Sequence, residues 1–267
     1  MSEHVALVTG GASGIGAGIV RALVEAGWDL RVADAQPGTA KAATSLGAVG
    51  HVVDVRDDEA ITAWVNRYPE ATALVTSAGV CAGQSLLQST DADWHSVLDV
   101  NLMGSVRALR AFARNRVAAG GGGAVVLIGS NNAFWPARTL GPYCASKAAV
   151  MMLGRVAASE LGEHQIRVNV VAPGETDTPM TRAALADPGE LAEISRRTPL
   201  GRVGTPADIG SAVALLLDPG AAWITGQLIS VDGGISLRGE SDLNPVHQSV
   251  PLEVAQFPGS GPGAFPR

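Results

Sequence analysis

The sequence predicts an α/β fold, with one doubly wound domain built around a parallel sheet, and three observations indicate it. Short apolar runs alternate with segments of helical periodicity, as is typical of crossover connections between parallel strands. The runs are apolar almost throughout, which suits a sheet covered by helices on both faces. The chain has 267 residues, which is within reach of one large domain.

Seven apolar runs are predicted to be the strands of this sheet. They are residues 5–8, 30–33, 49–53, 73–75, 124–128, 167–171 and 227–230. Five segments between them have apolar residues at helical spacing and are predicted helices. They are residues 15–25, 60–66, 93–117, 142–161 and 206–217.

Three regions depart from this alternation. Residues 120–123 are four glycines, which predict a turn between a helix and a strand. Residues 174–205 form a long insertion between a strand and a helix, and structured insertions of this length are often lids or binding loops. Residues 236–267 are rich in Pro, Gly and polar residues. We therefore expect one domain over residues 1–235 and a C-terminal tail over residues 236–267.

Composition and charge exclude several classes of protein. The formal net charge is -6 and no run of Arg or Lys is present, so we expect no nucleic-acid partner. No apolar run is long enough to span a bilayer and no signal peptide is visible, so we expect no membrane association. Two cysteines are too few for a disulfide framework, which favours a cytoplasmic protein. The five histidines have no metal-ligand spacing, and we expect no metal site.

Tyr143 and Lys147 are the most informative pair of residues for chemistry. Residues four apart share one face of a helix, so the two side chains can meet. A free phenol has a pKa of about 10 and is a poor base at neutral pH, but a nearby ammonium lowers that pKa. Ser130 follows the apolar run at 124–128, where its hydroxyl can hydrogen-bond the same substrate oxygen. Alone, this spacing also occurs on solvated helices, so the rest of the chain decides the matter.

A glycine-rich turn follows the first predicted strand and opens the first predicted helix. Such a turn lets backbone N–H groups and a helix N-terminus approach a pyrophosphate. Glycines also serve plain tight turns, but the position between a strand and a helix favours a dinucleotide site. The predicted binding residues of this turn are Gly10, Ser13, Gly14, Ile15 and Gly16.

Asp34 ends the second predicted strand. A carboxylate there can accept hydrogen bonds from both adenosine ribose hydroxyls, and it would repel a 2′-phosphate. The residue before Gly14 is Ser13 rather than Arg or Lys, so no visible cation offsets that repulsion. The sequence therefore predicts NAD, rather than NADP, as the cofactor.

In the order and spacing of these motifs, the chain resembles the short-chain dehydrogenase/reductase family over about residues 4–235. The motifs are residues 9–16, Asp54-Val55, Ser77-Ala78-Gly79, Asn101, Ser130, Tyr143 with Lys147, Pro173-Gly174 with Thr178, and Val231-Asp232-Gly233-Gly234. The resemblance implies a seven-stranded Rossmann-type catalytic domain with residues 174–205 as its substrate-binding loop. It also implies an NAD-dependent oxidoreductase that interconverts a secondary alcohol and a ketone by hydride transfer.

The resemblance implies roles for four catalytic residues. Tyr143 would take the alcohol proton during oxidation, and Ser130 would orient the reacting oxygen. Lys147 would lower the pKa of Tyr143 and bind the nicotinamide ribose. Asn101 would kink its helix and hold a water in a proton relay to Lys147.

The resemblance also implies cofactor contacts outside the glycine-rich turn. The adenine would be held by Asp54 and Val55, and the adenosine ribose would be lined by Ala78 and Gly79. The nicotinamide carboxamide would be fixed by Pro173, Gly174, Thr176 and Thr178. Two departures from the family pattern stand out: Thr76-Ser77 replaces the usual Asn-Asn, and Glu175 replaces an uncharged residue.

The substrate-side residues predicted from the loops are Asn132, Trp135, Arg138 and Glu175. Trp135 and its neighbour Phe134 favour a ring-bearing or flat apolar substrate, and Arg138 could pair with a carboxylate. Residues 129–133 and 173–180 are similar to the dihydro-dihydroxybenzoate dehydrogenase branch of the family, which oxidises cyclic dihydrodiols with NAD. A cyclic diol is therefore one expected substrate class.

Two alternatives stay open. One is a carbonyl or 3-oxoacyl thioester reductase, although such enzymes usually prefer NADPH, which Asp34 disfavours. The other is a non-catalytic dinucleotide-binding protein on the same fold. The resemblance also implies a homotetramer or homodimer formed through the two long helices, and we expect the tail to reach a neighbouring subunit near its active site.

Overall fold

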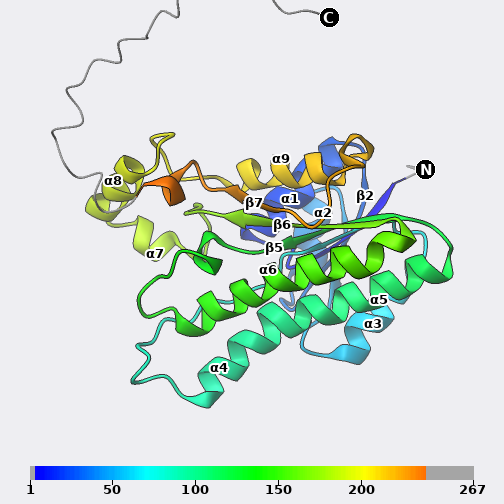
Figure 1. Cartoon of the computed structure of the whole chain (residues 1–267), viewed down its shortest axis with the longest axis horizontal. Coiled ribbons are helices and arrows are strands. Elements are labelled where there is room, and N and C mark those ends of the chain that lie inside the picture. The colour runs from blue at the N-terminus through cyan, green and yellow to red at the C-terminus, as the bar shows by residue number, and fades with distance from the viewer. Residues whose placement is uncertain (1–3, 239–267) are drawn as a thin grey trace, which may run out of the picture.

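The computed structural model describes residues 4–238, in which seven parallel strands form one sheet between two layers of helices (Figure 1). The strand order is β3-β2-β1-β4-β5-β6-β7, and every neighbouring pair is parallel. The strands are β1 Val5–Thr9, β2 Asp29–Asp34, β3 Val49–Val52, β4 Ala73–Thr76, β5 Gly123–Ile128, β6 Ile166–Pro173 and β7 Leu228–Val231. The predicted doubly wound α/β fold is confirmed.

Helices cover both faces of this sheet (Figure 1). One face is covered by α1 Gly14–Glu25, α2 Thr39–Ser45 and α9 Pro206–Leu217, and the other by α3 Asp58–Asn66, α5 Gly104–Ala118 and α6 Gly141–Leu161. Successive strand residues point to opposite faces, so Leu7 joins the apolar cluster with Phe112, whereas Val8 joins the cluster with Ile19 and Ile209. This two-sided burial is the reason that the strands read as continuous apolar runs.

The prediction of one continuous helix over residues 93–117 is wrong. The segment consists of α4 Asp91–Leu98, a π-helical turn Asp99–Met103, and then α5. The first helix begins two residues before the predicted start, because Thr90 and Asp93 form a reciprocal capping box. Apolar spacing alone does not distinguish a π-helical turn from continuous α-helix.

Three helices lie where the sequence analysis predicted none: α2, α7 Arg182–Leu185 and α8 Pro188–Arg197. Only Thr39 and Ala43 of α2 are buried, and α7 and α8 bury no residue completely. Helix α7 has only four residues, and α8 has only two large apolar residues, Leu191 and Ile194. Neither offers the repeated apolar spacing that identified the other helices. Helices α7 and α8 lie within the predicted insertion at residues 174–205.

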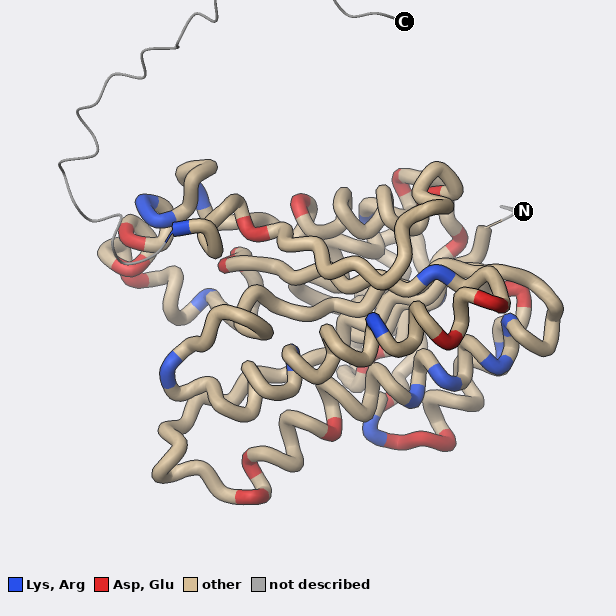
Figure 2. Tube along the Cα trace, viewed as in Figure 1, with Lys and Arg blue, Asp and Glu red and all other residues tan. Residues whose placement is uncertain are grey.

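The described chain ends in a 3-10 turn at Ile235–Leu237. The predicted tail lies almost entirely outside the described residues, so its reach toward a neighbouring subunit stays a prediction. Acidic and basic positions interleave over the outer elements in Figure 2. One ion pair joins two helices, since Arg110 of α5 lies 2.9 Å from Asp58 of α3. Within residues 4–238, no helix combines the length and apolar character needed to cross a membrane.

Candidate active site

Ser130, Tyr143 and Lys147 come together where β5 ends and α6 begins. Lys147 is buried, and its Nζ donates a hydrogen bond of 2.9 Å to the carbonyl oxygen of Ile128, the last residue of β5. The same Nζ lies 5.6 Å from the centroid of the Tyr143 ring. Ser130 follows β5 by two residues, and its Oγ accepts a hydrogen bond of 3.1 Å from the Asn132 amide. The structure thus places these three predicted residues around one point.

The predicted direction of the Tyr143 pKa is wrong. Burial raises the pKa of Tyr143 to about 12, and a hydrogen bond with Ser130 opposes that rise only in part. Burial also lowers the pKa of Lys147 to about 8. Both shifts have one cause, since a low-dielectric environment disfavours the charged form of each group. Burial therefore sets the direction of both pKa shifts.

Asn101 lies in the π-helical turn and is buried. Its Nδ2 donates to the Val80 carbonyl oxygen at 3.0 Å and to the Ser146 Oγ at 2.9 Å, while its Oδ1 accepts from the Val80 amide at 2.8 Å. The side chain therefore ties the loop after β4 to the helix that carries Tyr143 and Lys147. Single π-helical turns are frequent at functional sites.

The glycine-rich turn after β1 has the backbone geometry of an anion site. Gly10 has φ of +68°, and a Cβ there would lie 2.5 Å from the backbone of Ala78. A Cβ on Gly16 would meet the carbonyl oxygen of Gly10. Ser13 precedes α1 without a side-chain capping bond, and no acidic residue occupies the first turn of that helix. The N–H groups at this end of α1 are therefore suited to a pyrophosphate.

Asp34, at the end of β2, faces this turn. Its Oδ2 accepts a hydrogen bond of 3.2 Å from the Ala12 amide, and its Oδ1 accepts one of 3.2 Å from the Gln36 amide. The carboxylate is thus fixed beside the glycine-rich turn, at the sheet position where an adenosine ribose would lie.

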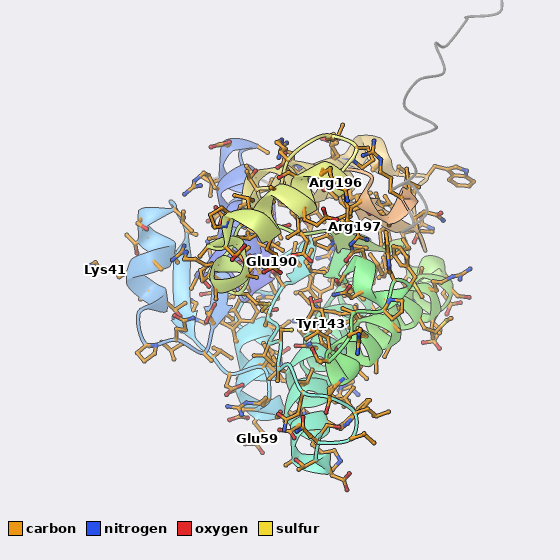
Figure 3. The ribbon with its side chains drawn as sticks, turned by 90° about the vertical axis from the view of Figure 1, so that its left-hand side faces the viewer. Lys41, Glu59, Tyr143, Glu190, Arg196 and Arg197 are labelled. Carbon is orange, nitrogen blue, oxygen red and sulfur yellow. The ribbon has the colours of Figure 1, made fainter. Side chains whose placement is uncertain are left out.

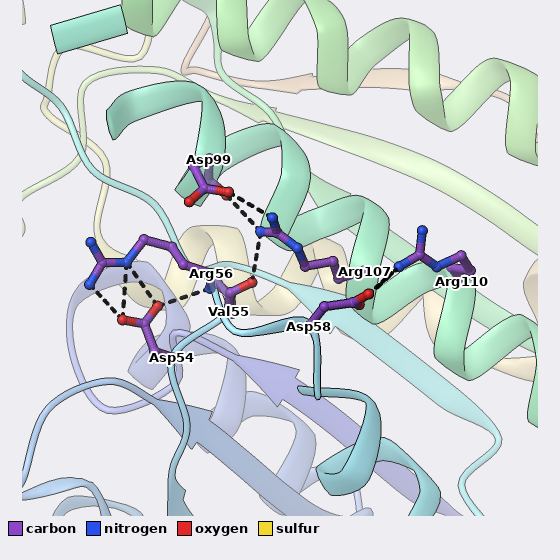
Figure 4. A network of polar contacts seen from close by, with 7 residues as sticks. All are labelled: Asp54, Val55, Arg56, Asp58, Asp99, Arg107 and Arg110. Atoms are coloured by element: carbon purple, nitrogen blue, oxygen red, sulfur yellow. Dashed lines mark hydrogen bonds and ion pairs between the residues drawn. The ribbon is translucent and has the colours of Figure 1, made fainter. Parts of the chain in front are cut away.

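Asp54 and Val55 follow β3 in a network of ion pairs (Figure 4). The Asp54 carboxylate lies 2.6 Å from the Arg56 guanidinium, which lowers the pKa of Asp54. Arg107 pairs with Asp99 at 2.8 Å and donates to the Val55 carbonyl oxygen at 3.2 Å. An adenine amino group would share the Asp54 carboxylate with Arg56.

The segment after β6 lies over the glycine-rich turn. A Cβ on Gly174 would lie 2.6 Å from the Asp232 Cβ, so glycine is required for this close approach. Thr176 is buried, and its Oγ1 donates to the Gly174 carbonyl oxygen at 2.9 Å. A Cβ on Gly14 would lie 3.6 Å from the Thr178 Cβ.

Across the site, a Cβ on Gly79 would lie 3.6 Å from Lys147 Nζ. The loop after β4, which carries Gly79, therefore surrounds one cradle at the carboxyl ends of the strands, together with the glycine-rich turn and the segment after Pro173. The cradle has the backbone approach and the polar groups that a dinucleotide requires.

Of the four predicted substrate-side residues, three lie close to the catalytic side chains. Asn132 bonds Ser130 through its amide, and Trp135 follows in the same turn, with its amide donating to Asn131 at 2.8 Å. Burial raises the pKa of Glu175, and its charge in turn raises the pKa of Tyr143, so the two groups are within electrostatic reach. Arg138 is exposed at the surface.

One residue escaped the sequence analysis. Arg197 ends α8, and its guanidinium lies 5.5 Å from the centroid of the Trp135 ring. The only sequence signal was the adjacent pair Arg196 and Arg197 inside the predicted substrate-binding loop. The sequence does not say which of the two side chains is partly buried.

Comparison with known proteins assigns the chain to a family. The family model described as Enoyl-(Acyl carrier protein) reductase matches residues 10–236. Galactitol 2-dehydrogenase (L-tagatose-forming) of Cereibacter sphaeroides is 39% identical over 242 residues, covering 87% of this chain and 94% of that protein. The chain belongs to the short-chain dehydrogenase/reductase family.

Other members of the short-chain dehydrogenase/reductase family align over similar lengths. Cis-4-hydroxycyclohexanecarboxylate dehydrogenase of Sinomonas cyclohexanicum is 34% identical over 243 residues, which are 87% of this chain and 96% of that protein. The 3-oxoacyl-[acyl-carrier-protein] reductase MabA of Mycobacterium tuberculosis is 36% identical over 241 residues, covering 86% and 92%. A gluconate 5-dehydrogenase from Burkholderia cenocepacia, solved with NADP and tartrate, superposes with a TM-score of 0.84 at 29% identity, covering 90% and 97%.

As a short-chain dehydrogenase/reductase, this protein is an oxidoreductase that interconverts secondary alcohols and ketones. The family binds a nicotinamide dinucleotide, and at least one structural neighbour was solved with NADP. The choice between NAD and NADP therefore has to be argued from the residues of this chain. The local resemblance to the dihydrodiol branch stays a prediction.

Proposed function

We propose that this enzyme oxidises a ring-bearing secondary alcohol with NAD and reduces the corresponding ketone with NADH. The observation that carries the proposal is the buried Lys147 ammonium beside the Tyr143 ring, with Ser130 near enough to lower the pKa of Tyr143. Trp135 supports a ring-bearing substrate, because its indole belongs to the turn that follows Ser130 and can pack against a ring.

A nicotinamide cofactor, when bound, would supply the hydride chemistry at the alcohol or carbonyl carbon. Ser130 donates a hydrogen bond to the reacting oxygen and holds it in line with Tyr143. In the oxidation direction, Tyr143 acts as a phenolate that the Lys147 ammonium stabilises, and it accepts the hydroxyl proton to become a phenol. In the reduction direction, Tyr143 donates its proton to the developing alkoxide. Asn101 positions α6 and the loop after β4 for these steps.

In this proposal a dinucleotide would be held at the carboxyl ends of the strands. The glycine-rich turn and the N-terminus of α1 bind the pyrophosphate, and Lys147 binds the nicotinamide ribose. The adenosine half is held by Asp34, Asp54, Val55, Ala78 and Gly79. The nicotinamide carboxamide is held by Pro173, Gly174, Thr176 and Thr178.

Asp34 supports NAD over NADP. Its carboxylate is fixed by two backbone amides, so it cannot easily swing away from a 2′-phosphate. A negative group placed there accepts hydrogen bonds from a ribose diol and repels a phosphate.

A second candidate function is reduction of a 3-oxoacyl thioester. The high pKa of Tyr143, about 12, favours it, since a protonated phenol is ready to donate to a carbonyl oxygen at neutral pH. The relative that bears this activity in its name is 36% identical. The non-catalytic alternative differs from both candidates, because it requires cofactor binding without turnover.

The active enzyme is a homotetramer or homodimer in this proposal, formed through α5 and α6. A groove of about 500 Å³ between these helices is lined mostly by apolar side chains, and Val117 and Val156 are exposed along it. An apolar groove of this kind fits a second copy of the chain. Val156→Glu should then lower the sedimenting mass. We also place the enzyme in the cytoplasm, as its cysteine content favours.

The test is turnover by the purified protein with NAD and with NADP. The panel holds ring-bearing secondary alcohols, a cyclic dihydrodiol, a sugar alcohol and a 3-oxoacyl thioester. The proposal expects the fastest turnover with NAD and a ring-bearing alcohol, and a large loss in Ser130→Ala. Preference for NADPH and the thioester would select the second candidate. Cofactor binding with no turnover on the whole panel would favour the non-catalytic alternative.

A further inference from the structure

Arg197 occupies an unusual position for a surface helix residue. It is the last residue of α8, it is partly buried, and its guanidinium stacks on Trp135 at 5.5 Å from the ring centroid. An arginine that stacks on an aromatic ring keeps its N–H edge available for hydrogen bonds in the plane of the guanidinium.

The charge of Arg197 is not neutralised within residues 4–238. No hydrogen bond or ion pair joins its guanidinium to any residue in that range, although Glu193 is within electrostatic reach. Its neighbour Arg196 differs, since it is exposed and makes a bidentate pair with Glu193 at 2.6 and 2.9 Å. The two adjacent arginines thus have opposite roles, and Arg196 is a natural control for Arg197.

Helix α8 is connected to the active site at both ends. Near its N-terminus, the charge of Glu190 raises the pKa of Glu175, and the charge of Glu175 raises that of Tyr143. At its C-terminus, Arg197 stacks on Trp135, whose turn begins beside Ser130. In the view of Figure 3, Arg197 lies between Arg196 and Tyr143.

We propose that Arg197 binds a carboxylate of the substrate, so that the substrate class is a hydroxy acid whose apolar body lies on Trp135. This inference rests on the proposed oxidation of a secondary alcohol at Tyr143. A planar guanidinium pairs with a carboxylate through two parallel hydrogen bonds. A dianionic phosphate fits less well, because Glu193 on the same helix places negative charge within electrostatic reach of Arg197.

The acidic residues also limit where the carboxylate lies. Glu190 and Arg197 are seven residues apart on α8, which corresponds to about 10 Å along the helix axis. The carboxylate therefore binds at the Arg197 end, remote from Glu175. In this proposal we expect acids whose hydroxyl is several carbons from the carboxylate to be better substrates than 2-hydroxy acids.

The first test measures binding without turnover. Cyclohexanecarboxylate and cyclohexanecarboxamide are titrated by calorimetry into the full chain saturated with NAD, for the wild type, Arg197→Met and Arg196→Met. Wild type and Arg196→Met should bind the carboxylate roughly 10- to 100-fold more tightly than the amide, the size expected for a hydrogen-bonded ion pair. Arg197→Met should lose that difference and bind the amide unchanged. Circular dichroism and NAD affinity verify that each variant is folded.

The second test measures turnover of 4-hydroxycyclohexanecarboxylate, its carboxamide and 2-hydroxyhexanoate. Arg197→Met should lose activity on the first through KM with little change in kcat, and Arg197→Lys should recover part of it. Equal binding of carboxylate and amide by the wild type, or equal losses in Arg196→Met and Arg197→Met, would overturn the proposal. Turnover of the amide alone would also overturn it while leaving the dehydrogenase function intact. Carboxylate binding with no turnover would instead contradict the proposed function.

Discussion

Replacement of the buried Lys147 by Met should make the enzyme inactive and, at neutral pH, more stable. Lys147 is 5% exposed, and its only hydrogen bond within the described residues goes to the Ile128 carbonyl oxygen. Among those residues no carboxylate pairs with its ammonium. A buried charge without a counter-charge costs free energy, which the native packing has to offset.

The lowered pKa of Lys147 gives the size of this cost. The fall from 10.5 to about 8, at about 1.4 kcal/mol for each pKa unit, corresponds to about 3 kcal/mol. The cost is fully present below the native pKa, where both states are protonated. It disappears as the pH rises toward 10.5, because the native state loses its proton before the unfolded state does. Lys147→Met also loses the hydrogen bond to the Ile128 carbonyl oxygen, which reduces the gain in unfolding free energy by about 1 kcal/mol.

The assay is urea unfolding followed by circular dichroism at neutral pH and near pH 10.5. Lys147→Met should be about 1 to 3 kcal/mol more stable than the wild type at neutral pH, and that advantage should fall by about 2 to 3 kcal/mol at the higher pH. Lys41→Met is the control, since Lys41 is exposed on α2 and is labelled in Figure 3. A Lys147→Met variant whose stability relative to the wild type does not change with pH would refute the reasoning.

Three further predictions concern the cofactor cradle and the scaffold. Asp34→Asn should shift the NAD-to-NADP ratio of kcat/KM by about 10-fold or more toward NADP, because it removes one negative charge beside the ribose. The control Asp29→Asn, at the other end of β2, should leave this ratio unchanged. Gly16→Ala should weaken NAD binding and lower the free energy of unfolding by about 1 to 3 kcal/mol, since its Cβ would collide with the backbone. The control Gly162→Ala should change the free energy of unfolding little, because a Cβ there has no neighbouring atom within 4 Å. Thr205→Ala removes the capping box of α9 and should cost about 1 kcal/mol, while Thr205→Ser should not.

Much of the fold could be predicted from the sequence, because the signals were strong and local. Continuous apolar runs such as β5 and β6 identified the parallel strands, and the apolar stripes of α1 and α9 identified helices. The glycine-rich turn was recognisable because close backbone approach leaves no room for a side chain at Gly10 and Gly16. The meeting of Tyr143 with Lys147 followed from helical spacing alone.

The rest depends on burial and on contacts between distant segments. The pKa of Tyr143 depends on how much water the fold removes from its surroundings, which spacing does not reveal. Arg196 and Arg197 are adjacent in the sequence, and only the course of α8 decides that one pairs with Glu193 and the other stacks on Trp135. Helix α8 has only Leu191 and Ile194 as large apolar residues, one turn apart, and that pattern is too short to identify a helix by spacing.

The most direct test of the central claim compares wild type with Tyr143→Phe. NADH formation from a ring-bearing secondary alcohol and NAD is followed by absorbance, and NAD affinity is measured on the same samples by calorimetry. The account predicts that the variant loses turnover by roughly 100-fold or more, the contribution of a positioned acid–base group, and keeps its affinity for NAD within about 10-fold. A Tyr143→Phe variant that turns over at a rate close to the wild type would contradict the role of Tyr143.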